Sequence, residues 1–132
     1  MTIQGSGAGA EQNLLLKVYR AFNAREIEKV ISHMHVDVVW PNGMEGGWVH
    51  GQDGVRAYWT RQFRSFDPHV EPLRFTPQIG RIAVDVHQVV RDLKGAVVVD
   101  QMVQHVYTID EGLIRRMEIR KYQPQPIEQV SA

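Results

Sequence analysis

The chain has 132 residues, of which 43% are hydrophobic and 23% charged, a balance typical of one soluble globular domain and not of a disordered or fibrous chain. Its 15 basic residues equal its 15 acidic residues, so no net charge attracts a polyanion, and we expect no nucleic-acid partner. The lack of cysteine excludes disulfides, thiolate metal sites and a cysteine nucleophile. With no signal-like start and no apolar run long enough to cross a bilayer, the sequence predicts a cytoplasmic protein without a membrane partner.

The first half of the chain shows helical periodicity in three segments. A glycine-rich leader over residues 1–10 is predicted to be flexible, and a helix follows from Glu11. A second, short helix is predicted to reach Met34, and a third to start at an N-cap, Asp53, and to end before Pro68. The apolar faces of these helices comprise Leu14, Leu15, Val18, Tyr19 and Phe22, then Ile27, Val30, Ile31 and Met34, then Val55, Tyr58, Trp59, Gln62, Phe63 and Phe66.

The second half has the alternation and β-branched composition of strands. Strands are predicted over residues 81–92, 96–109 and 113–122, with turns at Leu93-Lys94-Gly95 and at "DEG". One short strand, "VDVVWP", precedes the third helix, and the proline-broken segment "VEPLRFTPQIG" is expected to interrupt regular structure. The tail over residues 123–132, rich in Pro and Gln, is not expected to be ordered. Helices followed by an antiparallel meander indicate an α+β fold.

Three stretches carry a resemblance to a known family. "YRAFNAREIEKVISHMHVDVVW", then "HGQDGVRAYWTRQF", and later "IDEGLIRRMEI" are similar to the nuclear transport factor 2-like superfamily, in its SnoaL-like and ketosteroid-isomerase-like branch. The resemblance covers roughly residues 14–122. It implies a single domain over residues 11–122, built as a cone-shaped roll in which a strongly curved antiparallel sheet wraps around N-terminal helices and encloses a cavity. It also implies a common pairing as a homodimer.

The catalytic positions of the ketosteroid isomerases are not kept. In that family a tyrosine on the first helix and a strand acid form an oxyanion hole, and an aspartate after the first strand moves the proton. Matching segments put these positions on Val18, with Tyr19 adjacent, on Gln101 and on Asn42. A valine donates no hydrogen bond to an enolate, and an amide takes no proton from carbon. The sequence therefore predicts that the protein is not a ketosteroid isomerase.

Two interpretations of the central strands give opposite faces to the cavity. Periodicity alone predicts that the valine side, Val84, Val86 and Val90, is buried. The count along the family pattern instead places Asp85, His87 and Val89 on the face of Gln101, Val103 and His105. Under that second interpretation, which we adopt here, Asp85 orients His87 as a catalytic acid or base. The alternative for His87 is a solvated or cross-strand-paired imidazole.

The family count defines a mostly apolar pocket for a small apolar molecule. We expect the ligand-binding residues to be Phe22, Met34, Trp40, Asn42, Trp59, Phe63, Val89, Gln101, Val103, His105 and Met117, with His87 and Asp85 as catalytic residues. His33, His35 and Asp37 have the spacing of strand ligands, but the predicted helix end breaks it, so we expect no metal and no cofactor. An outer apolar set, Val84, Val86, Val90, Met102 and Val106, would suit a homodimer.

Two functions follow from this pocket. The first is an enzyme of the cyclase, isomerase or dehydratase type that performs cofactor-free acid/base chemistry on a small, mostly apolar molecule. The second is a non-catalytic ligand-binding or dimeric assembly module of the same fold. The side chains of Asp85, His87 and His105 distinguish them, because a catalyst needs these groups to converge inside the cavity.

Overall fold

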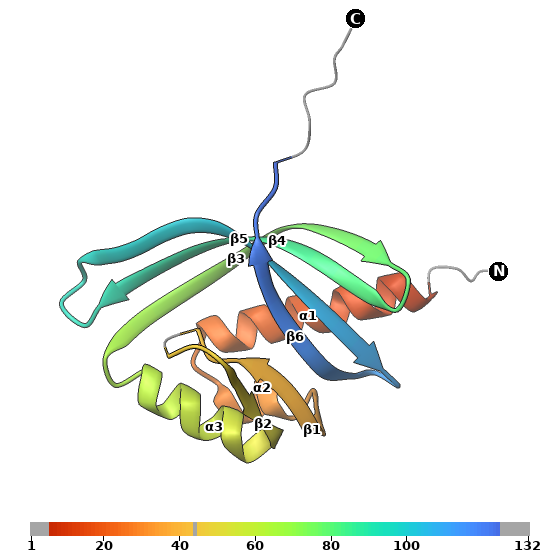
Figure 1. The fold of residues 1–132 in the computed structure, drawn as a ribbon, viewed down its shortest axis with the longest axis horizontal. Helices are drawn as coiled ribbons and strands as arrows, with labels where there is room; N and C mark the ends of the chain where they lie inside the picture. The colour runs from red at the N-terminus through yellow and green to blue at the C-terminus, as the bar shows by residue number, and fades with distance from the viewer. Residues whose placement is uncertain (1–5, 44, 125–132) are drawn as a thin grey trace, which may run out of the picture.

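The computed structural model describes residues 6–43 and 45–124 of the chain. In chain order the elements are α1 (Ser6–Asn23), α2 (Ile27–Ile31), β1 (Met34–Pro41), β2 (Trp48–His50), α3 (Gly51–Gln62), β3 (Phe66–Gln78), β4 (Arg81–Asp92), β5 (Val97–Asp110) and β6 (Leu113–Lys121). Helices in the first half and long strands in the second confirm the predicted α+β fold (Figure 1).

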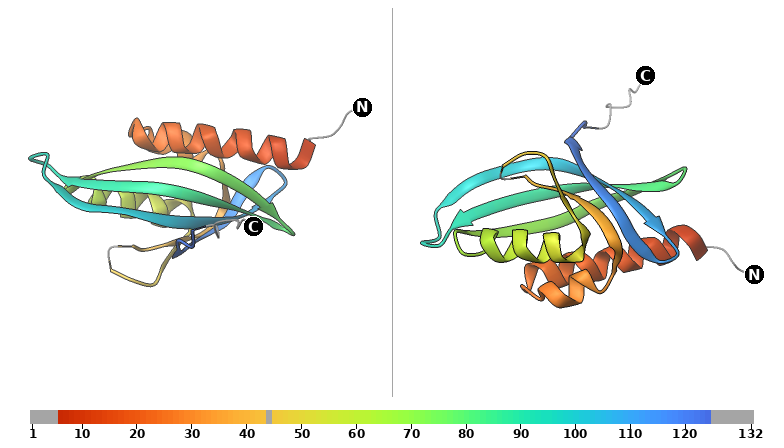
Figure 2. Two further views of the ribbon diagram at one scale, coloured as in Figure 1. Left: turned by 90° about the horizontal axis from the view of Figure 1, so that it is seen from above. Right: turned by 60° about the horizontal axis from the view of Figure 1, so that its bottom comes forward.

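All six strands form one sheet in the order β2-β1-β6-β5-β4-β3. Neighbouring strands are antiparallel except β1 and β6, which run parallel. The sheet curves strongly, and the helices lie along its concave side (Figure 2). The parallel pair departs from the predicted antiparallel arrangement, and it lets the end of the meander pack beside the first strand.

Helix α1 buries the stripe that the sequence predicts. Leu15, Val18 and Tyr19 are almost fully buried against the sheet, as expected of residues that recur on one helical face. The helix begins at Ser6, so residues 6–10 do not form the predicted flexible leader, while residues 1–5 lie outside the described part of the chain. Residues 6–10 therefore extend the helix by more than one turn beyond its predicted start at Glu11.

Two hydrogen-bonded contacts fix the end of α1 to the edge strand β3. The Asn23 amide donates to the Val70 carbonyl over 2.8 Å and accepts from the Val70 N–H over 3.0 Å. Just beyond the helix, Arg25 donates to the Pro68 carbonyl over 2.7 Å and pairs with Asp67. The guanidinium also lies 4.5 Å from the centre of the Phe63 ring. These contacts attach the end of α1 to the edge strand β3 and hold the helix along the concave face of the sheet.

The predicted ends of the second and third helices need correction. Helix α2 ends at Ile31, so Met34 starts β1 instead of closing the helix. Helix α3 begins at Gly51 with His50 at the N-cap position, and Asp53 lies inside its first turn, 2.5 Å from Arg56. Gly51 takes a positive φ of 75°, which favours glycine at this sharp entry. Phe66, predicted on the helix, begins β3.

The proline-rich segment after α3 is a strand and not an interruption. Strand β3 has 13 residues, including Pro68, Pro72 and Pro77, and it lies at the edge of the sheet beyond β4. An edge position tolerates proline, because a residue whose N–H faces away from the neighbouring strand has no ladder bond to lose. The prolines therefore identify the edge of the sheet.

Candidate functional site

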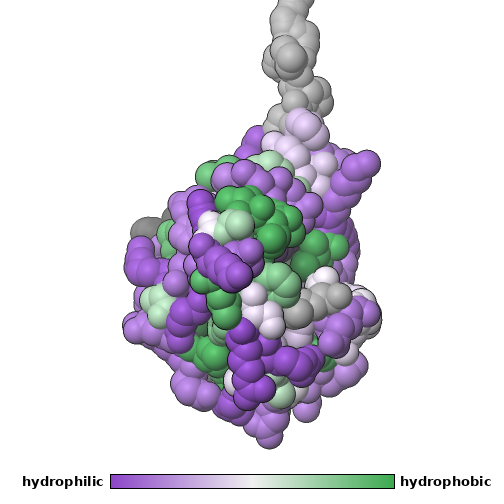
Figure 3. Space-filling model, turned by 90° about the vertical axis from the view of Figure 1, so that its left-hand side faces the viewer, coloured by the Kyte–Doolittle hydropathy of each residue, from purple (hydrophilic) through white to green (hydrophobic). Residues whose placement is uncertain are grey.

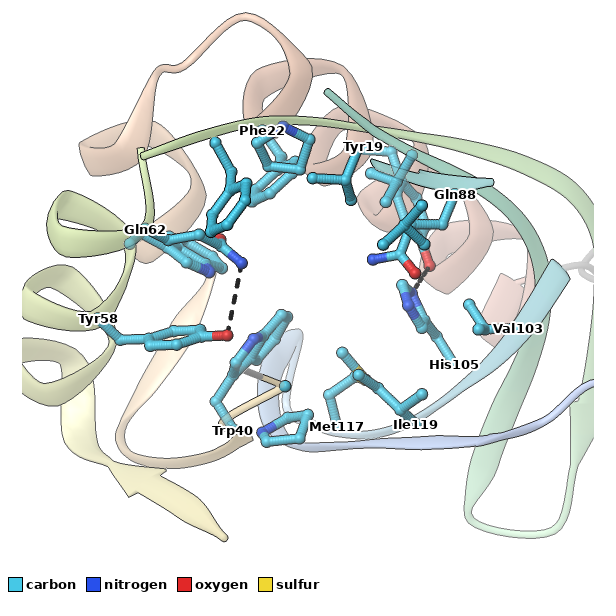
Figure 4. Close-up of a pocket in the computed structure, with 18 of the residues that line it drawn as sticks. Tyr19, Phe22, Trp40, Tyr58, Gln62, Gln88, Val103, His105, Met117 and Ile119 are labelled. Carbon is cyan, nitrogen blue, oxygen red and sulfur yellow. Dashed lines mark hydrogen bonds between the residues drawn. The ribbon is translucent and has the colours of Figure 1, made fainter. Parts of the chain in front are cut away.

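A cavity of about 700 Å³ lies between the helices and the concave face of the sheet (Figure 4). Its lining comprises Val18, Tyr19, Phe22, Val30, Trp40, Pro41, Gly43, Tyr58, Trp59, Gln62, Phe66, Pro68, Val70, Gln88, Val90, Val98, Val99, Gln101, Val103, His105, Tyr107, Met117 and Ile119. Most of these side chains are apolar, which is the usual character of a small-molecule site.

The exposed members of the lining mark the open side of the cavity. They are Gly43 after β1, Val98 and Gln101 on β5, and Ile119 on β6. Two further exposed apolar side chains lie nearby, Leu93 in the turn between β4 and β5 and Val97 at the start of β5. Seen from that end, the surface shows apolar side chains gathered among polar ones (Figure 3). A ligand can therefore enter between the first part of β5, β6 and the loop after β1.

Aromatic rings form one wall of the cavity. Trp40 and Trp59 meet edge to face with ring centres 5.4 Å apart, and Phe22 meets Trp59 at 5.3 Å. Trp59 comes from α3, Phe22 from α1 and Trp40 from β1, so three elements fix one aromatic cluster. Rings held in this way offer rigid, flat contact surface to an apolar ligand. Trp48 is half-exposed instead and stacks on Arg116.

A chain of three polar side chains lies in the closed part of the cavity. The Tyr107 hydroxyl donates to the Tyr19 hydroxyl over 2.9 Å, and the Tyr19 hydroxyl lies 2.8 Å from Nδ1 of His105. All three side chains are at most 6% exposed. With Tyr107 as the donor to its oxygen, Tyr19 has its own proton available for Nδ1, and the tautomer of the ring decides which of the two groups donates.

Burial determines the charge of His105. Burial lowers the pKa of His105 to about 4, so the imidazole is neutral near pH 7. In the tautomer whose Nδ1 accepts from Tyr19, the single ring proton is on Nε2. Burial also raises the pKa values of Tyr19 and Tyr107 well above their ordinary range, so both stay protonated. The site therefore presents a neutral N–H donor from His105.

The predicted pair of Asp85 and His87 lies on the other face of the sheet. In the β4–β5 ladder Val84 pairs with His105 and Val86 with Val103, so residues with even numbers on β4 face the cavity. Asp85 instead contacts Gln104, and His87 lies 2.7 Å from Asp100 on the exposed face. The family count was wrong here, and the periodicity of the valines gave the correct face.

A register shift explains the error. The pairing of β4 with β5 slips by one residue between Val90 and Arg91, next to the turn. A β-bulge of this kind turns every later side chain to the opposite face of the strand. A count carried through the hairpin without the bulge therefore exchanges inner and outer positions. The same shift turns Val84, Val86 and Val90 inward, so of the apolar set proposed for a homodimer interface only Met102 and Val106 stay on the outer face.

The remaining predicted ligand-binding residues divide into two groups. Met34, Asn42, Phe63 and Val89 do not line the cavity. The lining does include Phe22, Trp40, Trp59, Gln101, Val103, His105 and Met117. Asn42 instead organises the loop after β1, where its side chain accepts from the Glu45 N–H over 2.9 Å, and Met34 packs in the core.

The prediction missed the polar residues Tyr19, Tyr58, Gln62, Gln88 and Tyr107. Tyr19 supplies the hydroxyl on α1 that the sequence comparison had assigned to Val18 and found lacking. Its place on the predicted apolar stripe was the available signal, because a tyrosine buried in a hollow core needs a hydrogen-bond partner. On the inner face of the sheet, near the mouth of the cavity, the Gln88 side-chain oxygen accepts a hydrogen bond of 2.9 Å from the Gln101 side-chain amide.

A second polar group lies on α3, across the cavity from His105 (Figure 4). The Gln62 amide donates to the Tyr58 hydroxyl over a long 3.5 Å contact. Both residues line the cavity, one helical turn apart. The cavity thus has a polar group on the strand wall and another on the helix wall, with aromatic surface between them.

No Asp, Glu, Lys or Arg side chain occurs among the described residues of the lining. The described residues also contain no group of three or more His, Asp or Glu side chains that could hold a metal ion. Of the histidines weighed as ligands, His35 accepts from the Asp37 N–H over 2.9 Å and lies 3.1 Å from Arg115, away from the cavity. The polar chemistry of the site is therefore that of neutral donors and acceptors.

Comparison with known proteins agrees with this architecture. The SnoaL-like domain matches residues 15–117. The chain belongs to the SnoaL-like family. The resemblance stated from the sequence is thereby confirmed. Among proteins of curated function, none matches the chain.

Solved structures of the SnoaL-like and NTF2-like fold are similar over most of their length. TerC, co-crystallised with polyporic acid, is 28% identical, with a TM-score of 0.75 over 86% of this chain and 92% of TerC. An NTF2-like protein of unknown function from Burkholderia pseudomallei K96243 is 24% identical, with a TM-score of 0.75 over 86% and 91%. Rv0760c from Mycobacterium tuberculosis, in complex with estradiol-17β-hemisuccinate, is 19% identical, with a TM-score of 0.73 over 87% and 94%. The last two likenesses concern the fold alone.

In the described part of this SnoaL-like chain, none of the helices has the length and apolar character that crossing a membrane requires.

Proposed function

We propose that this SnoaL-like protein binds a small, mostly apolar molecule in its cavity and holds one oxygen of that molecule with His105. The observation that carries the proposal is the hydrogen-bonded chain from Tyr107 through Tyr19 to His105. When Nδ1 accepts from Tyr19, the ring has its N–H donor on Nε2. TerC, which is 28% identical to this chain, was co-crystallised with polyporic acid, and this supports a small-molecule ligand for the present protein. The aromatic cluster of Phe22 and Trp59 suits a flat, apolar body.

The chemistry available at this site is polarisation of a carbonyl or enol oxygen. A neutral imidazole N–H stabilises negative charge that develops on such an oxygen without transferring its proton. Full proton transfer along the chain would end in a buried phenolate on Tyr107, which its raised pKa disfavours. A carboxylate base is lacking in the described lining, so abstraction of a proton from carbon has no acceptor there.

These points favour ligand binding over the cyclase, isomerase or dehydratase alternative. That alternative rested on Asp85 and His87, which lie outside the cavity, on the exposed face. The cavity also differs from the site of a ketosteroid isomerase. The position of the catalytic base of those enzymes falls on Asn42, which is not part of the lining. The homodimer stays a prediction. Most of the apolar residues that motivated it face the inside of the protein and do not form an outer patch.

Calorimetric titration with 4-hydroxybiphenyl tests the proposal. The wild type should show saturable binding, and His105→Phe should weaken it roughly 3- to 10-fold, because one hydrogen bond to the ligand is lost. His87→Phe is the matched control on the outer face and should bind like the wild type. Circular dichroism verifies that both variants are folded. Equal weakening in the two variants, or no saturable binding at all, would contradict the proposal.

A further inference from the structure

The two polar groups of the cavity lie on opposite walls, and that arrangement carries information about the ligand. His105 belongs to β5 on the strand wall, and Gln62 belongs to α3 on the helix wall (Figure 4). Trp40, Trp59 and Phe22 lie in the lining between these walls. A molecule that fills this space meets aromatic surface along its body and a hydrogen-bonding group at each end.

Gln62 is suited to bind a ligand atom. A carboxamide offers two N–H donors and one oxygen acceptor, and the structure uses one donor, in the 3.5 Å contact with Tyr58. A hydrogen bond at this distance is weak compared with one near 2.9 Å. Exchange of that contact for a shorter one to a ligand therefore costs little. The side chain is half-buried at the end of α3, so its amide is held in place yet reachable from the cavity.

Gly43 lies beside the Tyr58 hydroxyl. A Cβ at this glycine would lie 3.7 Å from that hydroxyl, which is an ordinary van der Waals distance. Gly43 is itself part of the lining and is exposed at the mouth. The helix-wall polar group therefore lies next to a residue that lines the mouth of the cavity.

Charge complementarity limits the class of ligand further. The described lining contains no Lys, Arg, Asp or Glu side chain, and His105 is neutral because burial lowers its pKa. A charged ligand group would be desolvated without a counter-charge, which is unfavourable. Hydroxyl and carbonyl groups are matched by neutral donors and acceptors.

We propose that the ligand is an elongated, flat, uncharged molecule with an oxygen substituent at each end, one bound by His105 and the other by Gln62 with Tyr58. This inference rests on the proposed function and adds the second end of the ligand. A molecule with one polar end satisfies only one wall of the cavity. The Gln88–Gln101 pair near the mouth is the rival partner for the second oxygen, because both residues also line the cavity.

Two probes that differ by one hydroxyl test the inference. Calorimetry compares 4,4′-dihydroxybiphenyl with 4-hydroxybiphenyl on each variant, and the quantity read is the ratio of their Kd values. In the wild type the second hydroxyl should improve affinity roughly 3- to 10-fold. In the near-isosteric double variant Tyr58→Phe/Gln62→Met the ratio should fall to about 1, since the helix wall has lost its polar group.

Two further variants make the outcome decisive. His105→Phe should weaken both probes by a similar factor and so leave the ratio near the wild-type value, and Gln88→Met should also leave the ratio unchanged. Equal binding of the two probes by the wild type overturns the inference while leaving the proposed function intact. A ratio that survives Tyr58→Phe/Gln62→Met, or that is lost in Gln88→Met, also overturns it. Failure of both probes to bind the wild type contradicts the proposed function as well.

Discussion

His105 and His87 lie on neighbouring strands of one ladder and have opposite environments. Each makes one short hydrogen bond, His105 with Tyr19 over 2.8 Å and His87 with Asp100 over 2.7 Å. His105 is 6% exposed and faces the cavity, whereas the His87 side chain is 43% exposed on the outer face. The number of partners is the same, so the face of the sheet decides which histidine is a buried neutral donor and which is a solvated surface group.

The largest expected effect concerns the pH dependence of stability. In the unfolded chain the pKa of His105 is close to its ordinary value of 6.5, whereas burial in the folded protein lowers this pKa to about 4. The unfolded state therefore binds more protons between these values, and the free energy of unfolding falls as the pH is lowered from 6.5 to 4, by about 3 kcal/mol in all. Above pH 6.5 this contribution is constant.

Urea denaturation of the wild type and His105→Phe at pH 7.5, 5.5 and 4.5 measures the effect. Carboxylates titrate in both proteins, so the difference between them isolates the imidazole. The wild type should lose more stability than His105→Phe on acidification, and His87→Phe should behave like the wild type. Parallel curves for the wild type and His105→Phe would show that the buried histidine is protonated as easily as an exposed one.

An intermediate effect is expected from one substitution made on both faces of β4. Val86 is fully buried on the inner face, and Val89 lies on the outer face opposite Asp100. Val86→Thr should lower the free energy of unfolding by about 1–3 kcal/mol, because its hydroxyl is buried among apolar side chains. Val89→Thr should change it by less than about 0.5 kcal/mol. Chemical denaturation provides the comparison, and equal losses would refute the assignment of the two faces.

The smallest effect is expected at the exposed pair itself. His87→Ala should alter the free energy of unfolding by less than about 0.5 kcal/mol, since an exposed ion pair contributes little. It should also leave the affinity for 4-hydroxybiphenyl unchanged. Thermal unfolding and calorimetry on the purified variant measure both quantities. A loss of ligand affinity would restore His87 to the binding site and remove the contrast between the two histidines.

The sequence was sufficient for the fold class and for several apolar residues of the site. Helical periodicity identified Phe22 and Trp59 because their spacing on a helix is independent of the rest of the chain. The strand wall was harder, since one bulge between Val90 and Arg91 inverts β4 and leaves no composition signal. In the Tyr19–His105–Tyr107 chain, Tyr19 is separated from His105 by 86 positions in the sequence and from Tyr107 by 88 positions. No local pattern in the sequence predicts such a contact.

The backbone of the edge strand β3 has a consequence for assembly. Pro68 and Pro72 have no N–H, and both polar groups of Val70 between them bond the Asn23 side chain. The Pro68 carbonyl is taken by Arg25. Along this stretch the border of the sheet offers no donor to an incoming chain, so growth by β-augmentation, whether by a peptide partner or by fibril-like stacking, finds no template there. The opposite border is a strand of only three residues, β2.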